Sequence, residues 1–111
     1  MKKKLFQNYE YELDKNEKKV LSNFAKQALK QFETDDRSVK EVRIFTSIIQ
    51  KLNSVEEKIK FTKEEKTNLT FQLNNNLTHL KKKADNAWFL TKWFYNNMIK
   101  QYQNILSTFN N

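Results

Sequence analysis

The chain has 111 residues, with 21 Lys and Arg against 13 Asp and Glu, a formal net charge of +8, and no glycine, proline or cysteine. Without cysteine, disulfide frameworks and thiolate metal sites are excluded. Without glycine and proline, the tight hairpin turns and phosphate-binding loops that need them are excluded as well. We therefore expect an all-α protein, a small four-helix assembly of two packed αα-hairpins with no sheet.

The beginning of the chain shows no targeting signal. Residues 1–4 are basic, but polar side chains interrupt the stretch that follows, so the apolar region of a signal peptide is missing. The longest apolar runs, 87–90 and 93–95, are far shorter than a membrane span. We expect a cytoplasmic protein with no membrane partner, built as a single domain over residues 1–111, in which residues 1–13 are a loosely ordered segment.

The first predicted hairpin covers residues 14–54. Asp14 and Glu17 form a capping box that opens a helix with one apolar face. Ser38 and Glu41 have the same spacing and predict the start of a second helix. An acidic connection separates the two helices. Because acidic groups would approach phosphate there, a sequence-reading helix-turn-helix is disfavoured.

The second predicted hairpin covers residues 61–109. Thr62 and Glu65 form a third capping box. A narrow apolar stripe follows, made of Leu69, Leu73, Leu77, Leu80 and Ala84. A fourth helix is predicted to begin near residues 85–86. Its apolar side comprises Trp88, Tyr95, Met98, Ile99, Tyr102, Ile105, Leu106 and Phe109.

Residues 58–73 allow a second interpretation. Ile59 and Phe61 alternate with polar residues, as in a β-strand, so this stretch would suit a β-hairpin such as the wing of a winged helix. The capping box at Thr62 and the missing turn glycine favour the helix.

The search for catalytic chemistry finds no motif. His79 is the single histidine, and no acid or second histidine lies at helical spacing beside it, which suits an ordinary surface or half-buried residue. Most carboxylates belong to helix starts or to solvated charge runs. We expect no enzyme activity, no catalytic residues, no metal site and no cofactor.

Lysine-rich helix faces are the more informative feature. The candidate nucleic-acid or anion contacts are Lys15, Lys19, Lys26 and Lys30 on the first helix, Lys40, Arg43 and Lys51 on the second, and Lys81, Lys82, Lys83 and Lys100 near and on the fourth. A row of lysines on one helix face can bind successive phosphates of a nucleic-acid backbone. Lysines that point outward can also have no role other than to keep the protein soluble.

Phe89 and Trp93 fall on the side of the fourth helix opposite its apolar stripe. Aromatic rings among Lys and Asn suit stacking on unpaired bases or a protein interface. Burial in a second core would also explain them, and the sequence leaves these alternatives open.

The sequence thus predicts a small basic binding protein without catalytic activity that engages nucleic acid or a nucleoprotein complex. Lysine far outnumbers arginine and asparagine is abundant, which fits AT-rich coding. This composition and the small size suit an accessory or inhibitor protein of a phage or plasmid. The alternative is a protein–protein interaction module, a homodimer or adaptor that uses the aromatic face of the C-terminal helix.

Overall fold

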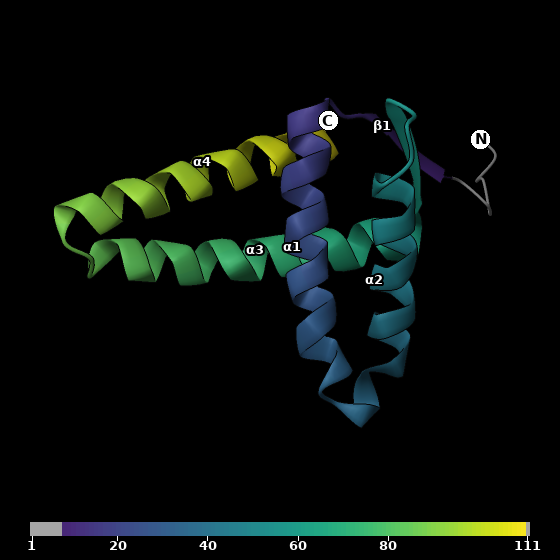
Figure 1. The fold of residues 1–111 in the computed structure, drawn as a ribbon, viewed down its shortest axis with the longest axis horizontal. Helices are drawn as coiled ribbons and strands as arrows, with labels where there is room; N and C mark the ends of the chain where they lie inside the picture. The colour runs from purple at the N-terminus through teal and green to yellow at the C-terminus, as the bar shows by residue number, and fades with distance from the viewer. Residues whose placement is uncertain (1–7, 111) are drawn as a thin grey trace, which may run out of the picture. The chain divides into compact units, whose positions relative to one another are not determined.

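The computed structural model describes residues 8–110, which are mostly helical, as predicted. In chain order the elements are β1 (Asn8–Glu12), α1 (Lys15–Glu33), the short 3₁₀ helix η1 (Asp36–Ser38), α2 (Val39–Leu52), β2 (Lys58–Thr62), α3 (Lys63–Asp85) and α4 (Phe89–Asn110) (Figure 1). The chain divides into two compact units, one ending at Leu69 and one beginning at Thr70. The packing of two hairpins into one assembly stays a prediction.

The expectation that no sheet would form is wrong. β1 and β2 pair as a two-stranded antiparallel sheet, in which Tyr9 lies opposite Phe61 and Tyr11 opposite Ile59. Ile59 and Phe61 are buried on one face of β2, and the rings of Tyr11 and Phe61 lie 6.3 Å apart. The pairing joins segments about fifty residues apart, so no local turn signal announces it.

The alternative of a β-hairpin over residues 58–73 is also wrong. Its first five residues form a strand, but the strand pairs with β1 and ends at Thr62. The hydroxyl of Thr62 accepts the N–H of Glu65 at 3.1 Å, and the Glu65 carboxylate accepts the N–H of Thr62 at 2.9 Å. This predicted capping box therefore converts the chain directly from strand to helix.

The segment expected to be loosely ordered, residues 1–13, lies partly outside the described residues. Of the part that is described, residues 8–12 form β1. Leu13 is buried, and its N–H donates to the carbonyl of Glu57 at 3.0 Å. From Asn8 onward this segment is thus tied to the strand region rather than loose.

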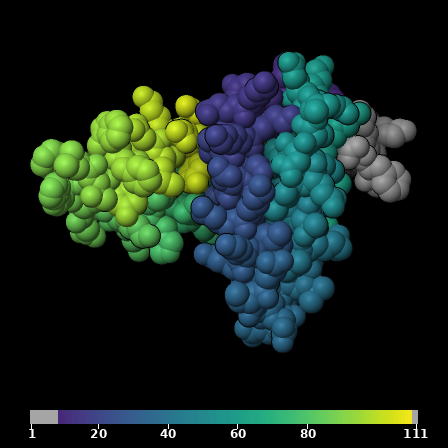
Figure 2. All heavy atoms as spheres, viewed as in Figure 1, coloured from purple at the N-terminus to yellow at the C-terminus, as the bar shows by residue number. Residues whose placement is uncertain are grey.

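α1 and α2 pack against each other, and their columns lie side by side in the ribbon and in the space-filling view (Figure 1; Figure 2). The Asp14–Glu17 capping box forms as predicted. The predicted box at Ser38 does not, because Ser38 ends η1 and makes no side-chain cap bond. The apolar side chains buried in α1 and α2 are Leu21, Phe24, Ala25, Ala28, Ile44, Phe45, Ile48 and Leu52.

α3 and α4 leave a link of three residues between Asp85 and Phe89. The predicted stripe of α3 is buried at all five positions, from Leu69 to Ala84. On α4 the buried side chains are Ile99, Tyr102, Ile105, Leu106 and Phe109. The prediction that Trp88 joins them is wrong, since Trp88 is 61% exposed and lies in the link, before α4 begins at Phe89.

Candidate nucleic-acid interface

Four lysines form a row along the outer side of α1. The capping box starts this helix, since the Asp14 carboxylate accepts the N–H of Glu17 at 2.8 Å. Burial of Leu21 and Phe24 then determines which side of the helix turns inward. The opposite side carries four exposed lysines, here named the basic row: Lys15, Lys19, Lys26 and Lys30. At 1.5 Å per residue the row is about 22 Å long.

The charge of the basic row is not balanced by carboxylates. The ion pairs that the structure contains between residues 8 and 110 join other cations to Asp35, Glu64 and Glu65. None of these pairs includes a lysine of the basic row. All four ammonium groups therefore remain available to an external anion.

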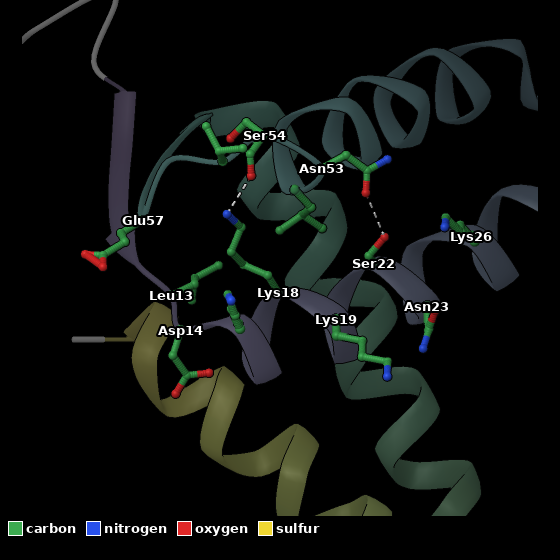
Figure 3. A pocket seen from close by; sticks show the side chains of 13 residues that line it. Leu13, Asp14, Lys18, Lys19, Ser22, Asn23, Lys26, Asn53, Ser54 and Glu57 are labelled. Carbon is green, nitrogen blue, oxygen red and sulfur yellow. Dashed lines mark hydrogen bonds between the residues drawn. The ribbon is translucent and has the colours of Figure 1, made fainter.

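A hollow of about 820 Å³ lies between the first half of α1 and the loop after α2. Lys15, Lys19 and Lys26 of the basic row line it, as do Asn23 of α1 and Asn53 of the loop (Figure 3). We call it the basic hollow.

Two carboxylates also line the basic hollow. Asp14 is occupied as the helix cap, and Glu57 is the one acid that the loop contributes. Counting Lys18 as well, four lysines face two acids, so the hollow has an excess of positive charge.

Lys18 lines the basic hollow too, although it was not among the residues predicted from the sequence. Its Nζ donates to the carbonyls of Ser54 and Glu56, both at 2.7 Å, as Figure 3 shows for Ser54. These bonds use two of its three donors and hold the loop against α1. Its position three residues after Lys15, at the edge of the basic row, was the signal that could have identified it.

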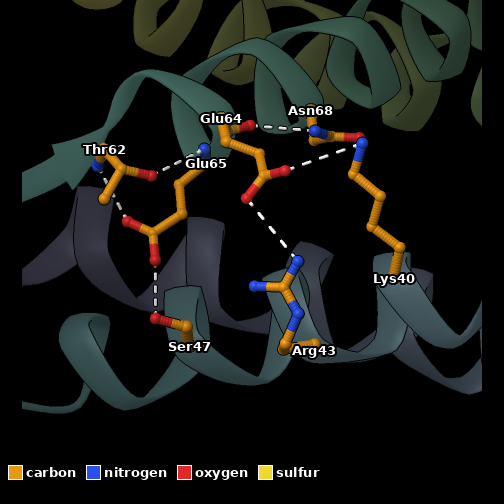
Figure 4. Close-up of polar contacts among 7 residues, drawn as sticks. All are labelled: Lys40, Arg43, Ser47, Thr62, Glu64, Glu65 and Asn68. Carbon is orange, nitrogen blue, oxygen red and sulfur yellow. Dashed lines mark hydrogen bonds and ion pairs between the residues drawn. The ribbon is translucent and has the colours of Figure 1, made fainter. Parts of the chain in front are cut away.

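The three candidate cations of α2 differ from the basic row, because α3 brings carboxylates to them. Glu64 lies between Lys40 and Arg43, with ion-pair distances of 3.6 and 3.7 Å (Figure 4). Lys51 Nζ lies 2.6 Å from the carboxylate of Glu65. Tertiary structure therefore separates two lysine sets that looked alike in the sequence, and only one of them keeps its charge unbalanced.

Glu65 is a buried carboxylate with a complete set of donors. It accepts the hydroxyl of Ser47 at 2.5 Å, the ammonium of Lys51, and the N–H of Thr62. Burial raises the pKa of Glu65, but the hydrogen bonds from Lys51, Ser47 and Thr62 outweigh it and keep the pKa below its ordinary value. The group is a structural anion that joins α2 to the start of α3.

The remaining candidate cations belong to the unit that begins at Thr70. Lys81, Lys82 and Lys83 are exposed in the last turns of α3, and Lys100 is exposed on α4. A second hollow, of about 510 Å³, lies at the link between these helices. Among the residues that line this turn hollow are His79, Lys82, Lys83, Trp88, Thr91 and Tyr95.

The two candidate aromatic anchors are at the surface, since Phe89 is 75% exposed and Trp93 is 68% exposed. The alternative that a second core buries them is therefore wrong. Three neighbours that were not predicted as anchors are exposed with them. The five residues form what we call the apolar patch: Trp88, Phe89, Leu90, Trp93 and Phe94. The sequence shows that five large apolar residues lie close together in the chain, but it does not show that they are exposed.

No cluster of side chains typical of a metal site is found in the part of the chain that the structure describes. Between residues 8 and 110 no three His, Cys, Asp or Glu side chains gather as metal ligands would. His79 lines the turn hollow beside lysines, which are not metal ligands at neutral pH. In the same residues, no helix has the length and apolar character needed to cross a bilayer.

Comparison of the chain with protein-family models, with curated proteins and with solved structures finds no match.

Proposed function

We propose that this chain is a small binding protein without catalytic activity, and that its basic row and basic hollow engage the phosphates of a nucleic acid, free or within a nucleoprotein complex. The observation that carries the proposal is a contrast, within one unit, between the cations of α2 and those of α1. Carboxylates of α3 pair with the cations of α2, whereas the four lysines of α1 have no ion pair among the described residues. An accessory or inhibitor role suits a protein of this size.

The arrangement supports phosphate binding in two ways. The basic row is a straight series of ammonium groups on a well-capped helix, long enough to meet several phosphates in succession. The basic hollow adds Asn23 and Asn53, whose amide groups can donate to phosphate or sugar oxygens. With few groups that would read base edges, binding through this surface is expected to be independent of base sequence.

A salt series with matched charge variants tests the proposal. The first variant changes the four lysines of the basic row to Gln. The control changes Lys40, Arg43, Lys58 and Lys60 to Gln, which gives the same net charge but leaves the basic row intact. Affinity for a fluorescent DNA duplex of about 20 base pairs is measured by anisotropy at several salt concentrations. The basic-row variant should lower the log–log salt slope by about 3 to 4, whereas the control should change it little.

Two results would contradict the proposal. One is equal loss of binding in both variants, which would mean that net charge alone attracts the nucleic acid. The other is a wild-type protein that binds neither duplex nor single strand at low salt. Circular dichroism of each variant shows whether the helices are retained.

The apolar patch favours a second candidate function, a protein–protein interaction module. Trp88, Phe89 and Trp93 are more than half exposed, and rings of this kind dominate the energetics of protein interfaces. Light scattering at two concentrations, on wild type and on Trp93→Ala, tests self-association. A monomer at both concentrations would exclude the homodimer.

A further inference from the structure

The turn hollow combines cationic and aromatic side chains in one small space. Lys82 and Lys83 bring ammonium groups from α3, and Trp88 and Tyr95 bring aromatic rings from the link and from α4. Its volume of about 510 Å³ is within the range of sites that hold small organic groups. All of its lining residues belong to the unit that begins at Thr70.

These groups match the requirements of an unpaired nucleotide. A base stacks on an aromatic ring, and Trp88 offers a ring that is 61% exposed. The phosphate on either side of the base needs a cation, and Lys82 and Lys83 lie at the same hollow. His79 and Thr91 supply groups that can hydrogen-bond to a base edge.

The apolar patch extends the aromatic surface away from the turn hollow. Trp88 and Phe89 are stacked, with ring centroids 5.3 Å apart and planes inclined by 18°. Trp93 follows one helical turn after Phe89 and is 68% exposed. Exposed rings that follow one another along the chain are the arrangement on which successive bases of a single strand stack.

Charge decides between this ligand and a second copy of the chain. From Thr70 onward the sequence holds five lysines and a single acid, Asp85. Two copies meeting at this end would bring like charges together, whereas a polyanion would be attracted. A bilayer with anionic lipid would also be attracted, but a lipid headgroup has no aromatic base to stack on Trp88.

We propose that the turn hollow receives an unpaired base of a single-stranded nucleic acid, with Trp88 as the stacking platform and with the adjoining phosphates on Lys82 and Lys83. This inference rests on the proposed function, since it assumes that the ligand is a nucleic acid. It adds that the ligand is single-stranded, because the bases of a duplex are stacked on each other and cannot enter.

Trp88 itself serves as the probe. The variant Trp93→Phe leaves Trp88 as the single tryptophan, so its fluorescence reports on the turn hollow alone. Titration with a thymidine oligonucleotide of about 12 residues should quench this fluorescence. A DNA duplex of the same charge should bind at least about 10-fold more weakly and quench little.

Three further variants assign the contacts, with affinity read from the anisotropy of a labelled oligonucleotide. Trp88→Leu should weaken single-strand binding by about 5- to 150-fold, the range for one stacked base. The double variant Lys82→Gln with Lys83→Gln should weaken it about as strongly. The matched control, Lys58→Gln with Lys60→Gln, removes the same charge outside the turn hollow and should change affinity less than about 3-fold. Circular dichroism confirms that each variant is folded.

The failure of this inference differs from the failure of the proposed function. If duplex and single strand bind equally and Trp88→Leu has no effect, the inference is overturned while binding through the basic row stands. A second outcome is that the oligonucleotide quenches Trp88 fluorescence while the basic-row variant binds the duplex as well as its control does. This outcome supports the inference and overturns the role of the basic row. A Trp88 response to vesicles containing phosphatidylserine, or to protein concentration alone, without a response to the oligonucleotide would overturn the inference.

Discussion

The Nζ atom of Lys51 lies 2.6 Å from the carboxylate of Glu65, whose side chain is only 7% exposed. This contact connects α2 to the first turn of α3 and removes Lys51 from the cations available to a ligand. Glu65 also closes the capping box of α3 with Thr62. One carboxylate therefore serves both the local start of a helix and a tertiary contact.

Replacing Glu65 should destabilise the unit that ends at Leu69. Glu65→Ala removes the acceptor of Ser47, Lys51 and the Thr62 N–H, and we expect a loss of about 2 to 3 kcal/mol in the free energy of unfolding. Glu65→Gln keeps an acceptor for the Thr62 N–H and should lose about half as much. Urea unfolding followed by circular dichroism measures both. Equal stability of Glu65→Ala and wild type would contradict this role.

The stability of the same unit should depend on pH through Glu65. Its pKa in the folded state lies below the ordinary value of 4.5, so the folded protein binds this proton less readily than the unfolded chain. The stabilisation is therefore complete above about pH 5 and is lost as the pH falls through the folded pKa. Urea midpoints measured from about pH 7 to 3 should show a difference between wild type and Glu65→Gln that shrinks at the acid end. A difference that is independent of pH would exclude a contribution from the charge.

Lys18→Met should loosen the loop that follows α2. The substitution keeps most of the aliphatic chain but removes the bonds to the Ser54 and Glu56 carbonyls, at a cost of about 1 to 2 kcal/mol because the side chain is only half-buried. Hydrogen exchange should become faster at the Leu13 amide, which donates to the Glu57 carbonyl of this loop. Lys19→Met is the control, since Lys19 is exposed and neighbours the same hollow. Equal exchange at Leu13 in the two variants would contradict the role given to Lys18.

Two positions on α3 should respond very differently to truncation. Leu73 is fully buried, whereas Phe71 is 60% exposed. Leu73→Ala should cost about 2 to 5 kcal/mol, because it removes buried methyl groups and leaves a cavity. Phe71→Ala should change the free energy of unfolding by less than about 0.5 kcal/mol. Thermal unfolding followed by circular dichroism compares them, and a large loss in Phe71→Ala would mean that a partner or a second copy covers this ring.

Much of the helical framework could be predicted from local sequence. The Asp14–Glu17 and Thr62–Glu65 boxes predicted the starts of α1 and α3, because a capping box depends on residues three apart in the chain. The stripe from Leu69 to Ala84 predicted the buried side of α3, because helical periodicity is a local property as well.

The β1–β2 sheet could not be predicted in the same way. The alternation of Ile59 and Phe61 was visible, and Tyr9 and Tyr11 alternate with glutamates in the partner strand, but neither pattern says that these two segments pair. β1 can pair with β2 only because the packing of α1 against α2 brings the two strands together. No local sequence pattern encodes this packing.

For the candidate site as well, some properties of the basic residues follow from local sequence and others only from the tertiary structure. The sequence by itself determined that lysines form rows on the outer sides of α1 and α2, because helical periodicity places them there. Only the tertiary structure decided that Glu64 and Glu65 of α3 pair with the cations of α2 and not with those of α1. It also decided that Trp88 and Trp93 lie at the surface. The physical reason is that ion pairing and burial depend on distances between segments remote in the chain, and folding alone sets these distances.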